Sequence, residues 1–119
     1  MNCKVLIDGA EDAGKVVSEG DLTVDERGFT LAYTIDGDNC LLTGRGGTVT
    51  QSRRGSLNTD ATFVKGRRTA FVLSGGELSG EIPLITRSME VSVQGGLKLN
   101  IEYELGGAKI NLRLTADYI

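Results

Sequence analysis

Two apolar–polar alternations separated by two glycines dominate the C-terminal part of the chain. Every second residue is apolar from Leu97 to Leu105 and again from Ala108 to Ala116, with polar residues between them. Alternation with a period of two is typical of a half-buried β-strand, and a two-glycine loop fits a tight hairpin turn. Pairing Leu105 with Ala108 brings both apolar sets onto one face, so pattern and turn predict the same register.

The same alternation continues upstream of this hairpin. Residues 89–93 align with residues 97–101 if Gln94-Gly95-Gly96 forms a three-residue loop, which is a common hairpin connection when a glycine adopts the left-handed conformation. A meander of three strands is therefore expected from Pro83 to Ile119.

A further hairpin is predicted near the N-terminus. Pairing Val24 with Phe29 aligns two apolar sets across the loop 25–28, and it places Gly20 opposite Tyr33, whose ring can cover the gap left by a glycine. Weaker strands and their turns are expected between the two meanders: strands at 41–43, 48–51, 61–65, 69–73 and 77–79, with turns at 65–67 and 74–76.

Composition agrees with an all-β chain. Glycine accounts for 17 of the 119 residues, about twice the usual share, which favours many tight turns. No stretch has the apolar spacing of a long helix. Short antiparallel strands at regular spacing predict a sandwich or a closed barrel, and closure is favoured because it removes exposed strand edges. We expect one domain, residues 1–119.

The residues needed for most catalytic and metal sites are missing. The chain has no histidine and only two cysteines, Cys3 and Cys40, which cannot form the usual zinc cage. We expect two reduced cysteines and a buried structural thiol at Cys40. The apolar run 5–7 is too short for a signal peptide or a membrane span, so a cytoplasmic protein without a membrane partner is predicted. Neither enzymatic activity nor a cofactor is predicted.

Charge is distributed unevenly along the sequence. Residues 1–40 carry a net charge of −6, residues 41–76 of +5 and residues 77–119 of −2. Two interpretations stand: the cations pair with acidic neighbours on adjacent strands, or they form a surface for an anionic partner. The sequence pI of about 4.9 argues against nucleic acid. The basic residues are Arg45, Arg53, Arg54, Lys65, Arg67 and Arg68.

Several segments resemble a known family. The runs 49–56, 80–87 and 101–105, with Phe63, Gly66 and Gly95-Gly96, are similar to the YwiB-like family of small bacterial calycin-like β-barrels, a domain of unknown function. The resemblance implies a bacterial origin and a single antiparallel calycin-like or lipocalin-like barrel built from hairpin meanders. It supplies no activity and no catalytic residues. This chain is shorter than is typical of the family, with an apparent deletion near 43–48.

A ligand site inside the barrel is one hypothesis. Alternation from Ile85 to Val93 turns Arg87 inward, facing Tyr103, and a charged group inside a barrel is costly unless it is paired. Calycin-type barrels often bind the anionic head of a ligand with an internal arginine and tyrosine, so Arg87, Tyr103 and Tyr33 are candidate ligand residues. The alternative is that Arg87 lies near a rim and reaches solvent, or that it pairs with a buried acid.

The predicted function is therefore binding without catalysis, with a small anionic or amphipathic molecule in or at the mouth of the barrel. The alternative is an interaction module that uses the basic segment 45–68 on a protein or a nucleic acid. A homodimer that pairs open sheet edges is also considered, because a shortened barrel would leave such an edge.

Overall fold

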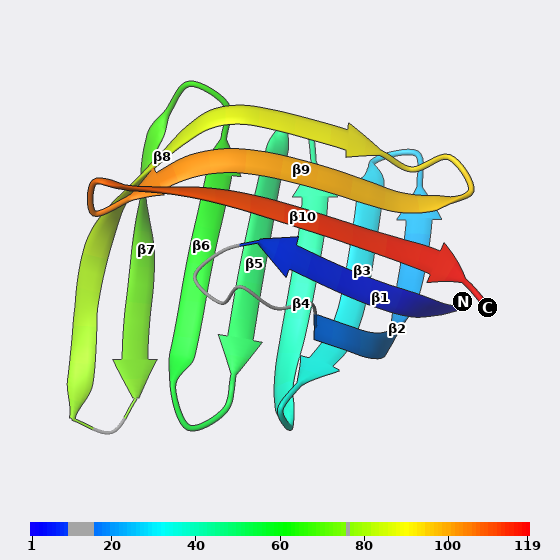
Figure 1. Cartoon of the computed structure of the whole chain (residues 1–119), viewed down its shortest axis with the longest axis horizontal. Helices are drawn as coiled ribbons and strands as arrows, with labels where there is room; N and C mark the ends of the chain where they lie inside the picture. The colour runs from blue at the N-terminus through cyan, green and yellow to red at the C-terminus, as the bar shows by residue number, and fades with distance from the viewer. Residues whose placement is uncertain (10–15, 76) are drawn as a thin grey trace.

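The chain forms a closed antiparallel β-barrel (Figure 1). The computed structural model describes residues 1–9, 16–75 and 77–119. Within these ranges there is no helix, and the sheet order is β1-β10-β9-β8-β7-β6-β5-β4-β3-β2. The strands are β1 (Asn2–Gly9), β2 (Val16–Asp25), β3 (Gly28–Ile35), β4 (Asp38–Arg45), β5 (Thr48–Arg54), β6 (Asn58–Val64), β7 (Arg68–Gly75), β8 (Leu78–Ser92), β9 (Gly96–Leu105) and β10 (Ala108–Tyr118).

Strand β1 closes the barrel by pairing with both β10 and β2. The all-β class and the closed barrel predicted from the sequence are confirmed. Each described strand pairs with two neighbours and the two ends of the sheet are joined through β1, so no described strand is an edge strand along its whole length; the second part of β8 has a partner on one side alone. No helix of membrane-spanning length and apolarity occurs in the part of the chain that the structure describes.

The predicted hairpin registers are confirmed. Leu105 pairs with Ala108 across Gly106-Gly107, and Val24 pairs with Phe29. Gly20 lies opposite Tyr33, where a Cβ on the glycine would lie 3.2 Å from the tyrosine Cβ and 2.6 Å from the carbonyl oxygen of Ala32. The segment 43–48 is a complete hairpin: β4 and β5 are joined by Gly46-Gly47, both with positive φ.

Strand β8 differs most from the sequence prediction. The predicted short strand at 77–79 and the start of the meander are one strand, whose first part, Leu78–Ile85, pairs with β7 and whose second part, Leu84–Ser92, pairs with β9. In Figure 1, β8 rises beside β7 and then bends across the ends of β3–β6. Because of this bend, one continuous strand pairs with β7 in its first part and with β9 in its second part. The predicted turn 74–76 ends at Gly76, which lies outside the described residues.

The core fills much of the barrel interior. Inward-facing apolar residues along the barrel wall are buried. The rings of Phe63 and Tyr103 pack edge to face, with their centroids 5.0 Å apart. Both cysteines are free and buried, and burial was predicted for Cys40. The largest fully buried apolar side chains are Phe63, Leu22, Leu31, Leu42, Leu84, Leu97, Ile101 and Leu114.

Candidate functional site

Arg87 does not enter the barrel. The pairing of β8 with β9 shifts register between Thr86 and Ser88, so one extra residue bulges out and the alternation changes phase. Thr86 takes the inward position with no exposed surface, while the Arg87 side chain is 60% exposed and donates from Nη2 to Oε2 of Glu104 at 2.9 Å. The predicted inward orientation of Arg87 was wrong for this reason.

The three predicted ligand residues lie in different places. Arg87 and Tyr103 both line a cavity of about 480 Å³ whose walls include the outward side chains of Glu102 and Lys109. Tyr33 belongs to β3, where it pairs with Cys40 of β4, and it lines no part of that cavity. The structure therefore does not bring Arg87, Tyr103 and Tyr33 together in one interior site.

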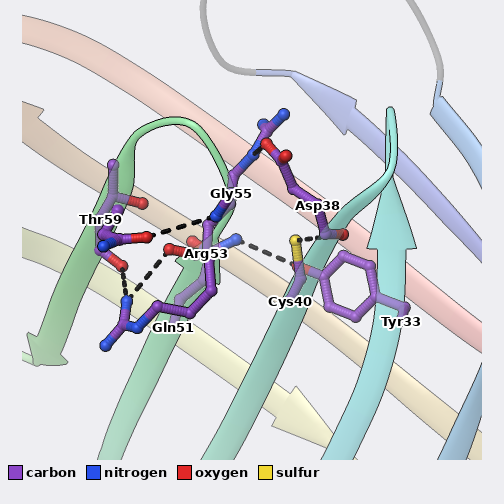
Figure 2. A network of polar contacts seen from close by, with 9 residues as sticks. Tyr33, Asp38, Cys40, Gln51, Arg53, Gly55 and Thr59 are labelled. Atoms are coloured by element: carbon purple, nitrogen blue, oxygen red, sulfur yellow. Dashed lines mark hydrogen bonds and ion pairs between the residues drawn. The ribbon is translucent and has the colours of Figure 1, made fainter. Parts of the chain in front are cut away.

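A different arginine faces the interior. Alternation along β5 puts Gln51 and Arg53 on the same face as the buried Val49, and Arg53 pairs with Cys40 across the sheet. Figure 2 shows Arg53, Gln51, Tyr33 and Cys40 gathered on three neighbouring strands. The spacing 49, 51, 53 was visible in the sequence, but Arg53 was assigned to the basic surface by its charge.

Two hydrogen bonds organise this group. Gln51 donates from Nε2 to the Tyr33 hydroxyl at 3.1 Å, and Arg53 donates from Nε to Oδ2 of Asp38 at 2.7 Å (Figure 2). Gly55 makes room for the second contact, because a Cβ there would overlap the Asp38 carboxyl group. Asp38 thus holds Arg53 through one nitrogen, and within the described residues the two Nη nitrogens make no hydrogen bond.

Burial and pairing set the protonation states. Burial raises the pKa of Tyr33 to about 12, so its hydroxyl is protonated at neutral pH. Burial also raises the pKa of the Cys40 thiol. The hydrogen bond to Asp38 raises the pKa of Arg53, so the guanidinium is charged at any physiological pH. The group therefore presents a cationic guanidinium, paired with the Asp38 carboxylate, beside neutral polar side chains.

A cavity of about 440 Å³ at one mouth of the barrel is lined by Asp38, Cys40, Gln51 and Arg53, and Tyr33 meets this lining through the hydrogen bond from Gln51. The mouth lies where the turn between β3 and β4 meets the connection from β5 to β6, toward the bottom of Figure 1. Ile35, Leu57 and Phe71 supply apolar walls, while Asp38, Gln51 and Arg53 supply polar ones. A volume in this range suits a small organic ligand, and a mostly apolar wall with a few convergent polar groups is typical of such sites. We call this cavity the polar mouth.

The predicted basic surface is divided between the two ends of the barrel. Arg53 and Arg54 lie at the end of β5 near the polar mouth, and Arg54 makes a two-pronged ion pair with Asp60 at 2.8 and 3.1 Å. The other four lie at the opposite end of the barrel, in or beside the β4–β5 and β6–β7 turns, and strands β5 and β6 separate them from Arg53 and Arg54. Those four are Arg45, Lys65, Arg67 and Arg68, all exposed. The six cations therefore do not form one continuous surface.

Comparison with known proteins gives one solved structure and no sequence relative. No family model matches the chain, and no curated protein is similar to it in sequence. The crystal structure of the ywiB protein from Bacillus subtilis matches with a TM-score of 0.66 at 16% identity, over 99% of this chain and 90% of that one. The chain has the YwiB fold. The resemblance predicted from the sequence is confirmed at the level of the fold, and the YwiB structure extends over the strands that form both mouths of the barrel.

Proposed function

We propose that this protein is a non-catalytic binder of a small amphipathic molecule, held at the polar mouth. The observation that carries the proposal is the Arg53 guanidinium, which is oriented by Asp38 and has both Nη nitrogens without a hydrogen bond in the described structure. A planar guanidinium with two adjacent donors suits a carboxylate or a similar oxygen-rich group. The apolar part of the ligand would lie against Ile35, Leu57 and Phe71.

The charge of Asp38 restricts the head group. Because the carboxylate already neutralises Arg53, the polar mouth does not offer a strong net positive charge. A ligand head with one negative charge or with neutral acceptor oxygens fits this balance better than a multiply charged phosphate. Gln51 adds an amide that can orient such a head through either its oxygen or its nitrogen.

The chemistry at the polar mouth favours binding over catalysis. The Cys40 thiol has a raised pKa, and a thiol must lose its proton to act as a nucleophile. Tyr33 holds its proton up to about pH 12 and accepts a hydrogen bond from Gln51, so it is a poor general base at neutral pH. Asp38, the remaining titratable group on the wall, is bound to Arg53.

Two neighbouring arginines provide a matched test. Arg53→Met removes the inward guanidinium and Arg54→Met removes the outward one, with the same change of side chain one residue apart. The probe is anilinonaphthalene sulfonate, an amphipathic anion whose fluorescence rises on binding, and native mass spectrometry of freshly purified protein reports any bound small molecule. We expect saturable binding with one site, weakened about tenfold by Arg53→Met and unchanged by Arg54→Met. Arg53→Lys, which keeps the charge, should retain part of the affinity.

The outcomes separate the proposal from its alternatives. A stoichiometric extra mass that disappears in Arg53→Met would support it and identify the ligand class. A bare mass together with no saturable probe binding would contradict it. Equal loss of binding in both methionine variants would also contradict it, because general electrostatic attraction would then account for the probe.

A further inference from the structure

The end of the barrel opposite the polar mouth carries an unfilled strand position. Among residues 1–9, 16–75 and 77–119, strand β8 pairs with β9 through Ser92, while its other edge has a backbone partner only as far as Thr86. There Gly66 donates its N–H to the Thr86 carbonyl at 2.8 Å, and Thr86 donates its own N–H to the Arg67 carbonyl at 3.3 Å. In the described residues, Ser88–Ser92 pair with β9 alone. An edge of this kind is a template for another strand.

A groove runs beside this edge. It has a volume of about 250 Å³ and lies between β8 and the tips of the β2–β3 and β4–β5 hairpins. Val91 and Val93 are 43% and 38% exposed on its β8 side, which is high for apolar residues in strands or their flanks. Phe29 and Val49 form part of the opposite wall. We call this region the β8 groove.

The described residues that line the β8 groove include two cations and no acidic residue. Arg27 and Arg45 line it directly, and the turn that carries Lys65 and Arg67 is fixed at its Thr86 end by the backbone bonds described above. No ion pair of these four is seen in the described structure. The acids at this end are Asp25 and Glu26 in the β2–β3 turn and Glu90 on β8, and Asp25 is bound to the backbone N–H groups of Arg27 and Gly28.

We propose that the β8 groove binds an extended acidic peptide segment of a partner protein by strand addition. The added strand would take hydrogen bonds from the free edge at Ser88–Ser92 and direct every second side chain toward Phe29, Val49 and Val91. Its acidic residues would lie near Arg45, Lys65 and Arg67. A second copy of this chain fits less well, because it would bring an identical set of cations against these.

The site differs from the polar mouth in chemistry as well as in place. At the polar mouth the arginine points inward and is held by an acid, whereas here the arginines stand at exposed tips and the recognition element is backbone. Loss of binding at one end therefore leaves the other end intact, and the two proposals fail separately.

The experiment uses a fluorescein-labelled peptide of about eight alternating Glu and Val residues, long enough to follow the whole edge at roughly 3.3 Å per residue. Binding to the full chain is followed by fluorescence anisotropy, and its place by amide chemical shifts. We expect saturable binding with shifts at Ser88–Val93 and at 44–49. A peptide N-methylated at alternate residues, which cannot donate to one strand edge, should bind about tenfold more weakly.

Protein variants test the charge requirement. Replacing Arg45 and Arg67 together by Gln should weaken the peptide about tenfold and reduce the salt dependence of binding. Replacing Arg54 and Arg113 by Gln removes the same charge elsewhere on the barrel and should leave the affinity unchanged. Each pair consists of exposed side chains, so folding is preserved, and thermal unfolding checks this.

Several outcomes would overturn the proposal. Absence of saturable binding would do so, as would equal affinity for the N-methylated peptide, because backbone pairing would then play no part. Shifts confined to the polar mouth would show that the peptide occupies the other site. A concentration-dependent dimer that shifts Ser88–Val93 without any peptide would identify a second copy as the occupant instead.

Discussion

Raising the pH should destabilise the folded protein through the buried phenol of Tyr33. This side chain is 3% exposed, its hydroxyl accepts a hydrogen bond from Gln51, and burial raises its pKa to about 12. In an unfolded chain the same group titrates near pH 10. Between those two pH values the unfolded chain releases a proton that the folded protein keeps, so unfolding becomes more favourable as the pH rises.

The size of the effect follows from the two pKa values. A factor of ten in an ionisation constant corresponds to about 1.4 kcal/mol, so the difference between about 12 and about 10 is worth about 3 kcal/mol. This contribution is fully present below about pH 10 and is lost as the pH rises through about 12. It is a considerable part of the free energy of unfolding of a small domain, which is typically about 5–15 kcal/mol.

Urea unfolding of three proteins between about pH 9 and pH 12 isolates the effect. Tyr33→Phe removes the buried hydroxyl, and Tyr118→Phe removes an exposed one at the end of β10. Tyr33→Phe should cost about 1 kcal/mol at neutral pH, because the bond from Gln51 is lost. Up to about pH 12 the free energy of unfolding should then fall by about 2 kcal/mol more in the wild type and in Tyr118→Phe than in Tyr33→Phe, because the folded phenol is only half ionised at its own pKa. Parallel pH curves for all three would refute the reasoning.

Substitutions elsewhere give two further tests by urea unfolding. Gly44→Ala would drive a Cβ into the Phe29 ring and should lower the free energy of unfolding by about 1–3 kcal/mol. At Gly80 nothing lies within 4 Å of an added Cβ, so Gly80→Ala should leave the free energy of unfolding unchanged or raise it by up to about 1 kcal/mol. Equal effects of the two substitutions would contradict this account. Arg87→Ala removes an exposed ion pair with Glu104 and should change stability by less than about 1 kcal/mol, whereas a loss above about 3 kcal/mol would indicate a buried role.

The hairpins could be predicted from local patterns, because a tight turn and the apolar alternation on either side of it involve residues that are close in sequence. Gly106-Gly107 and the residues that flank it specify one register, and the structure has that register. The long strand β8 could not be read in this way. Alternation from Ile85 to Val93 is interrupted in the sequence only by Arg87. In the structure, backbone groups of the β6–β7 turn form hydrogen bonds with the backbone of Thr86, and the bulge begins at the next residue. A distant contact thus decides which residues face inward.

The candidate site was missed for a different reason. Arg53 and Arg54 are adjacent and have the same charge, so a count of cations treats them alike, but in a strand they point to opposite faces. Arg54 meets Asp60 outside, and Arg53 meets Asp38 at the polar mouth. The alternation of Val49, Gln51 and Arg53 indicated the inward face. The partner Asp38 follows a turn in another hairpin, and only the fold brings it near.

Stabilisation of the fold alone is a poor explanation for the ion pair at the polar mouth. An ion pair that is partly withdrawn from water loses in desolvation much of what it gains in attraction, and apolar side chains of similar size often serve as well. Strand β5 itself offers the comparison: Val49, on the same face, fills the interior with a purely apolar group, while Arg53 brings a charge and requires both Asp38 and a glycine at position 55 to accommodate it. Such an arrangement is expected where hydrogen-bond donors must be held in place for a ligand. The comparison of Arg53→Met with Arg54→Met tests that explanation directly. If Arg53→Met changed the stability of the fold but not the binding of the probe, only a structural role for Arg53 would remain.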